Sequence, residues 1–235
     1  MEATVCAAGK GNMERTLLYG MQSSGASLAA LLAGQTPGSL AVVDLWWEHV
    51  APSLPSDVPT VVKATIGGVP LIQHLHSYAP TLTVLILRHP VDVVASLTSK
   101  IYRDEGIRLE RKLASLEQAF LTRNSFDLVI TYEQLTADAS LVASTLRSAG
   151  LELSADAHRF PRGADEIVSV TRRGSPWCNA HFNHGWGLGN ANLDALDPLV
   201  PVPQTRTLEA FNLVSRHCPQ LLASYEPHRP SNGFD

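Results

Sequence analysis

The stretch LTVLILRHPVDVVAS, residues 82–96, decides the fold of this chain. Its first six residues are apolar except for one threonine, as expected for a strand that is buried on both faces of a parallel sheet. Arg88 follows at the carboxyl end of this strand, and the next segment, VDVVASLTSK, has the composition of a helix. A buried strand that passes directly into a helix is the repeating unit of parallel α/β sheets.

The same alternation of strand and helix recurs along the chain. Strands are predicted at 16–20, 40–47, 60–66 and 126–132, and helices at 27–34, 109–120 and 138–149. A last helix is expected around 208–221, interrupted at Pro219, whereas residues 161–203 show little periodicity and are predicted to be loop. We therefore predict one α/β domain over residues 1–235, with three α/β/α layers around a central parallel sheet.

The charge and the cysteines restrict the class of protein. The chain has 18 Lys and Arg against 22 Asp and Glu, a formal net charge of −4, and no basic block, so neither nucleic acid nor a membrane is expected as a partner. Cys6, Cys178 and Cys218 lack the spacing of a disulfide framework or a zinc cluster, which favours a reducing compartment. The longest apolar run is too short to span a bilayer. With no signal-peptide pattern at the N-terminus, we expect a cytoplasmic protein.

A candidate phosphate loop, GMQSSGAS, occupies residues 20–27 between the first strand and the first helix. Small residues there allow backbone N–H groups to approach an anion, and the helix N-terminus adds a favourable dipole. The loop is not a Walker A motif, because no GKS or GKT follows. An ordinary strand-to-helix turn would explain the loop equally well.

Arg88 is the second candidate for binding an anion. Open α/β sheets bind ligands at the carboxyl ends of their strands, and a guanidinium at that edge can bind a phosphate through two hydrogen bonds. Ser96 lies eight residues further on, in the predicted helix. The alternative is that Arg88 pairs with a neighbouring carboxylate such as Asp92.

The two stretches, in this order, resemble the PAPS-dependent sulfotransferases, in which PAPS is 3'-phosphoadenylyl sulfate. The first resembles the family's Lys/Arg-Ser-Gly-Thr-Thr-like loop, which holds the 5'-phosphosulfate. The second matches the family's 3'-phosphate motif, Arg-x-Pro-x-Asp-Val-x-x-Ser, at Arg88, Pro90, Asp92, Val93 and Ser96. The resemblance implies a P-loop NTPase-like sulfotransferase fold and transfer of a sulfuryl group from PAPS, as co-substrate, to a hydroxyl or amine of a small-molecule or carbohydrate acceptor.

Two later segments extend the resemblance to about residues 16–182. ITYEQL resembles the family's Tyr-Glu-Asp-Leu segment and implies that Tyr132 lies beside the adenine. VTRRGSPWCNAHF resembles the Arg-Lys-Gly loop that closes over the nucleotide. The nucleotide-binding residues implied by the resemblance are Gln22, Ser23, Ser24, Gly25, Ala26, Ser27, Arg88, Ser96, Tyr132, Arg172, Arg173 and Gly174.

The first loop departs from the family pattern where the chemistry is most sensitive. Ser23 stands where the family carries Lys or Arg, whose charge offsets that of the bridging oxygen as the sulfuryl group leaves. Lys63, in the strand at 60–66, is predicted to replace it. Thr65 stands where cytosolic sulfotransferases have a catalytic His, so Asp44 is predicted as the general base, since burial at a strand end raises a carboxyl pKa. Asp44 could equally cap N–H groups at the strand end.

Several alternatives remain open from the sequence. The reserve candidates for the base are Glu48, His49, His74 and His76. A catalytically weak sulfotransferase-like nucleotide-binding protein is an alternative function, and so is a small-molecule kinase on a related fold. Cys178, His181 and His184 are spaced like metal ligands but lack a fourth ligand nearby, so no metal is expected. The acceptor and the oligomeric state are not indicated by the sequence.

Overall fold

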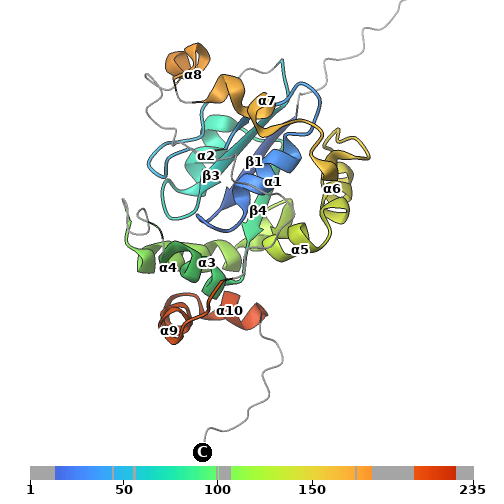
Figure 1. Ribbon diagram of the computed structural model, residues 1–235. Helices are drawn as coiled ribbons and strands as arrows, with labels where there is room; N and C mark the ends of the chain where they lie inside the picture. Colours follow the sequence, from blue (N-terminus) through green and yellow to red (C-terminus); the bar gives the residue numbers. More distant parts are fainter. Residues whose placement is uncertain are drawn as a thin grey trace, which may run out of the picture.

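The computed structural model describes residues 14–43, 45–54, 57–98, 100, 107–172, 174–181 and 204–225. Five strands form one sheet in the order β2-β3-β1-β4-β5, and all four neighbouring pairs are parallel (Figure 1). The strands are β1 (Arg15–Gly20), β2 (Leu40–Val42), β3 (Thr60–Thr65), β4 (Leu82–Leu87) and β5 (Leu128–Thr131). The predicted α/β fold with a central parallel sheet is therefore confirmed.

Apolar side chains alternate between the two faces of the sheet because successive residues of a strand point in opposite directions. In β1, Leu17 and Tyr19 belong to one buried cluster, whereas Leu18 belongs to the other. Each face carries a buried apolar cluster, as the continuous apolar run of β4 predicts. None of the helices within the described segments combines the length and hydrophobicity needed to cross a membrane.

The helices divide between the two faces of the sheet. The face of Leu18 packs against α1 (Ala26–Ala33), α5 (Tyr132–Ala137), α6 (Ala139–Ser148) and α7 (Ala164–Val168). The face of Leu17 packs against α2 (Leu71–Tyr78), α3 (Pro90–Thr98), α4 (Leu109–Leu121), α8 (Pro176–His181), α9 (Leu208–His217) and α10 (Pro219–Tyr225). Short 3-10 turns lie at η1 (Arg123–Ser125), η2 (Ala157–Arg159) and η3 (Ser169–Thr171).

Local sequence signals explain several helix ends. Asp138 caps α6 as expected, because its Oδ1 accepts the Leu141 N–H at 2.9 Å. Thr131 and Gln134 form a reciprocal capping box at the start of α5. The interruption predicted at Pro219 separates α9 from α10. The prediction of loop throughout residues 161–203 is wrong where α7, η3 and α8 form, because short helices carry too few turns to show a period.

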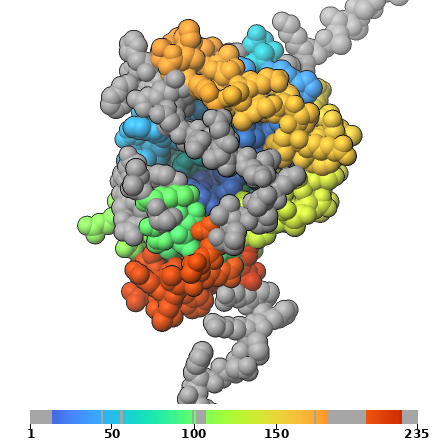
Figure 2. Space-filling view, in the orientation of Figure 1, coloured from blue at the N-terminus to red at the C-terminus, as the bar shows by residue number. Residues whose placement is uncertain are grey.

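The C-terminal helices pack beside the middle of the chain. α9 contacts both α3 and α4, and α10 contacts α4 and α3. In Figures 1 and 2 this orange-red segment lies against the green one that contains α3 and α4. The C-terminal segment thus supports the helix that follows Arg88.

The order of the strands creates a point where neighbouring connections diverge. β1 and β4 are adjacent, yet the chain leaves β1 toward β2 and leaves β4 toward β5 on the other side. Their following helices, α1 and α3, cover opposite faces of the sheet. Open α/β sheets bind ligands at the carboxyl edge of such a point. Both the loop after β1 and Arg88 after β4 begin there.

Candidate functional site

The loop between β1 and α1 contains two residues in a left-handed backbone conformation. Ser23 and Gly25 both have positive φ, 67° and 84°. Gly25 is the N-cap of α1 and provides no side-chain oxygen for the N–H groups of the first turn. The loop is tightly folded, because a Cβ at Gly20 would lie 2.8 Å from the Ala26 Cβ. The predicted strand, loop and helix are confirmed, with uncapped donors at the helix start.

Ser24 adds a buried polar atom to this loop. Its backbone N–H donates to the Met21 carbonyl at 3.1 Å, which closes the turn. Its hydroxyl is buried and makes no hydrogen bond within the described part of the chain. A buried hydroxyl of this kind usually has a partner, so a polar group that joins the loop would improve its hydrogen bonding.

Arg88 connects the end of β4 to this loop. Its side chain is only 6% exposed, and Nη1 donates to the Ser23 carbonyl oxygen at 3.0 Å. The guanidinium carbon lies 4.3 Å from the centre of the Tyr132 ring. Tyr132 also covers the loop, since a Cβ on Gly25 would lie 2.4 Å from its Cδ2. Three segments that are far apart in sequence thus meet around Arg88.

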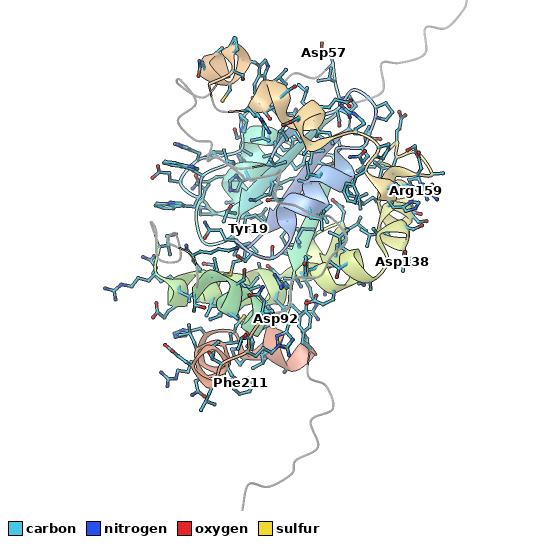
Figure 3. All side chains as sticks on the ribbon, viewed as in Figure 1. Tyr19, Asp57, Asp92, Asp138, Arg159 and Phe211 are labelled. Carbon is cyan, nitrogen blue, oxygen red and sulfur yellow. The ribbon has the colours of Figure 1, made fainter. Side chains whose placement is uncertain are left out.

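The carboxylate considered as the alternative partner of Arg88 has another cation. Asp92 accepts two hydrogen bonds from Arg206, 2.7 Å from Nε and 3.0 Å from Nη2. It lies in α3 near the C-terminal helices (Figure 3). Burial tends to raise the pKa of this carboxyl, but the hydrogen bonds and charge of Arg206, together with the charges of His89 and Arg88, outweigh it and leave the pKa below its usual value. Ser96, the other residue of this motif, is buried in α3.

Three lysines contact the loop or the helix behind it. Lys63 Nζ lies 3.3 Å from the Ser27 hydroxyl, and its side chain is 8% exposed. Lys100 Nζ donates to the Ser23 hydroxyl at 2.9 Å. Lys112 Nζ donates to Gln22 Oε1 at 2.9 Å. The loop, which has no cation of its own, is therefore surrounded by cations from β3, from the end of α3 and from α4.

Lys100 and Lys112 were missed by the sequence analysis. Lys112 did leave a signal, because it follows Leu109 by three residues and precedes Leu116 by four, which places it on the apolar stripe of its helix. A lysine at such a position needs a partner inside the protein. Lys100 left none, since 77 positions separate it from Ser23.

The Arg-Arg-Gly segment lies elsewhere. Thr171 donates a short hydrogen bond to the Ala41 carbonyl in β2, and Arg172 pairs with Asp165. β3 and β1 separate β2 from β4, which corresponds to about 14 Å at ordinary strand spacing. Gly174 has φ of 87°, and Arg173 lies outside the described residues. The structure does not bring Arg172 beside Arg88, and its binding of a 3'-phosphate stays a prediction.

The residues predicted as general base do not lie together at a described site. Asp44 lies outside the described residues, so its role as general base stays a prediction. His74 is a packing residue, because its buried Nδ1 accepts the Ala51 N–H at 3.0 Å. Burial lowers the pKa of His74 to about 4. His76, on the same helix, is exposed.

No metal cluster is present within the described segments, where no three His, Cys, Asp or Glu side chains come together. Cys178, in α8, is buried in the apolar cluster on the Leu17 face of the sheet. The His181 side chain and His184 lie outside the described residues, so the spacing of these three residues is not tested.

Comparison with known proteins gives structural neighbours alone. No protein-family model matches the chain, and no curated protein is similar to it in sequence. A crystal structure of retinol dehydratase with androsterone and the inactive cofactor PAP is 11% identical, with 88% of this chain and 80% of that chain covered and a TM-score of 0.46. A complex of retinol dehydratase with retinol and PAP is 10% identical, with 90% and 80% covered and a TM-score of 0.43.

Proposed function

We propose that this chain is a sulfotransferase that binds PAPS at the switch point between β1 and β4. The contact of Arg88 with the Ser23 carbonyl and the Tyr132 ring carries the proposal. It unites three of the four segments that resemble PAPS-dependent sulfotransferases. A buried guanidinium beside an aromatic ring at one strand end suits an anionic nucleotide.

The residues around the loop fit a nucleotide with two anionic ends. The uncapped start of α1 and the lysines suit the 5'-phosphosulfate, because N–H donors and ammonium groups both stabilise negative charge there. Arg88 and Ser96 suit the 3'-phosphate, and the Tyr132 ring offers a flat face for the adenine. When bound, PAPS supplies an activated sulfuryl group whose leaving group is a phosphate.

The chain's own residues then have separate roles in the reaction. A bond forms between the acceptor oxygen or nitrogen and sulfur, and the bond from sulfur to the bridging oxygen breaks, with its electron pair going to the nucleotide phosphate. Asp44 is proposed to take the acceptor proton. Lys63, placed beside Ser27 at the start of α1, is proposed to stabilise the charge that develops on the phosphate side.

Calorimetric titration with 3',5'-ADP, 5'-AMP and ATP tests the nucleotide assignment. We expect 3',5'-ADP to bind at least about tenfold tighter than 5'-AMP, which is about 1.4 kcal/mol of added binding energy from the 3'-phosphate. Equal affinities would overturn the assignment. ATP turnover with magnesium would instead identify the kinase alternative.

A screen of hydroxyl and amine acceptors with labelled PAPS then tests transfer. Labelled sulfate on a small-molecule or carbohydrate acceptor, with release of 3',5'-ADP, is the expected result. Tight binding of 3',5'-ADP without transfer to any acceptor would identify a catalytically weak, sulfotransferase-like nucleotide-binding protein.

A further inference from the structure

Lys100 contacts Ser23, the loop position at which the sulfotransferase pattern has Lys or Arg. The ammonium group donates to the hydroxyl of Ser23, with 2.9 Å between Nζ and Oγ. The backbone N–H of Lys100 donates to the Leu97 carbonyl at 2.9 Å, so this hydrogen bond joins Lys100 to the last turn of α3. One segment therefore provides two cations to Ser23, Arg88 before α3 and Lys100 after it.

Ser23 is held from both of its oxygens. Arg88 binds its carbonyl oxygen and Lys100 binds its hydroxyl, while the residue adopts a left-handed φ of 67°. Such a φ is unfavourable for a non-glycine residue and persists where the surroundings impose it. The two cations thus fix the direction in which the side chain at position 23 leaves the loop.

We propose that Lys100 supplies the positive charge that loop position 23 lacks, while Lys63 acts beside Ser27, at the end of the loop. The inference rests on the proposed function. The bond between sulfur and the bridging oxygen breaks with its electron pair moving to that oxygen, and the Lys100 ammonium offsets the charge that develops there. No proton needs to leave Lys100 for this role.

Lys63 and Lys112 are placed differently from Lys100. Lys112 is 3% exposed and binds the Gln22 amide at the start of the loop, and Lys63 is 8% exposed and contacts Ser27 at its end. Lys100 is half-buried and contacts the middle of the loop. A lysine introduced at position 23 would therefore share the place of Lys100, but not that of the other two.

Four variants test this exchange: Lys100→Gln, Lys63→Gln and each of them combined with Ser23→Lys. Glutamine keeps a hydrogen-bond donor at position 100 but removes the charge. We expect Lys100→Gln to lower kcat about 100-fold, comparable to the loss of one oxyanion-hole donor. Affinity for 3',5'-ADP should change less than about threefold, because the lost charge acts chiefly in the transition state. Ser23→Lys should restore turnover to Lys100→Gln and not to Lys63→Gln.

Sulfate binding provides a readout that does not require turnover. Sulfate titrated into protein saturated with 3',5'-ADP should bind about tenfold more weakly to Lys100→Gln than to the unmutated chain, or about 1.4 kcal/mol. Unchanged kcat or sulfate affinity in Lys100→Gln would overturn the role of Lys100. Absence of 3',5'-ADP binding in the unmutated protein would instead overturn the proposed function, so the two failures are distinguishable.

Discussion

The Arg88 guanidinium donates a 3.0 Å hydrogen bond to the carbonyl oxygen of Ser23. This bond joins the end of β4 to the loop after β1, across the neighbouring strands where the chain connections diverge. Because Arg88 also lies over the Tyr132 ring, the start of α5 belongs to the same assembly. The position of the loop therefore depends on a residue that is itself a candidate ligand for phosphate.

Arg88→Ala should weaken binding of 3',5'-ADP by about 1.5–3 kcal/mol, the usual contribution of a hydrogen bond to a charged group. Arg88→Lys should recover only part of this, since an ammonium group cannot reproduce the two parallel bonds of a guanidinium. Isothermal titration of each variant measures the change. Arg147→Ala is a suitable control, because Arg147 also donates to a backbone carbonyl, at Ser154, but from α6.

The outcome for the folded state separates a ligand-binding role from a structural one. If Arg88→Ala binds 3',5'-ADP normally and melts at a much lower temperature, Arg88 serves to hold Ser23 in place and is not a ligand for phosphate.

Gly25→Ala should damage the site through a specific collision. The new Cβ would lie 2.4 Å from Tyr132 Cδ2, in addition to the strain of a left-handed φ. Gly150→Ala provides a matched control, since Gly150 also has a positive φ but nothing within 4 Å of the added atom. Melting temperatures should fall more for Gly25→Ala than for Gly150→Ala, and 3',5'-ADP binding should be lost in Gly25→Ala alone.

A double-mutant cycle identifies the collision partner. Combining Gly25→Ala with Tyr132→Ala should destabilise the protein less than the sum of the two single changes, because removing the ring relieves the clash. Additive losses would show that the backbone strain at Gly25, and not contact with Tyr132, causes the effect.

Much of the fold could be predicted because its signals are local. The apolar run before Arg88 predicts a strand buried on both faces, and β4 is such a strand. Asp138 predicts a helix start, and its carboxylate caps α6. Such features depend on neighbours within a few residues, so they can be predicted from the sequence alone.

The surroundings of the loop could not be predicted in the same way. Lys100 contacts Ser23 across 77 positions of the sequence, a relationship that no short motif encodes. For Arg172 the sequence motif matches but the position does not. Arg172 lies near β2, at the edge of the sheet, and pairs with Asp165. Contacts between distant segments depend on how the helices pack, which spacing along the chain does not determine.

Glu133 is expected to position the Arg88 turn. Its Oε1 accepts the His89 backbone N–H at 2.8 Å, and its Oε2 accepts the Tyr225 hydroxyl at 3.3 Å. Glu133→Ala leaves the N–H of buried His89 without this acceptor, a loss of about 1–3 kcal/mol. Glu133→Gln keeps an oxygen for it. We therefore expect 3',5'-ADP affinity to fall in Glu133→Ala and to recover largely in Glu133→Gln.

Tyr225→Phe distinguishes the two hydrogen bonds of Glu133. It removes the hydroxyl at Oε2 and leaves the bond to His89, so 3',5'-ADP affinity should stay close to that of the unmutated chain. Equal losses in Glu133→Ala and Glu133→Gln would show that the negative charge of Glu133 matters, and not its acceptor for His89.

His74 should make the stability of the fold sensitive to mild acid. Burial lowers its pKa in the folded protein to about 4, below the ordinary value of 6.5 for an exposed imidazole. As the pH falls below 6.5, the unfolded chain gains a proton that the folded protein does not bind, so the free energy of unfolding falls until the pH reaches about 4. Protonation would also replace the lone pair of Nδ1 that accepts the Ala51 N–H.

Chemical denaturation at a series of pH values measures this contribution. At a limiting slope of about 1.4 kcal/mol per pH unit, His74 should account for roughly 1.5 kcal/mol of the stability lost between pH 6.5 and pH 5, because the unfolded imidazole is only half protonated at pH 6.5. In His74→Gln, a side chain that can still accept a hydrogen bond but does not titrate, this part of the loss should disappear. His76→Gln, at an exposed position on the same helix, should follow the unmutated curve. If His74→Gln loses as much stability as the unmutated chain over this range, the acid sensitivity must arise from other groups, and the neutral state of His74 does not stabilise the fold.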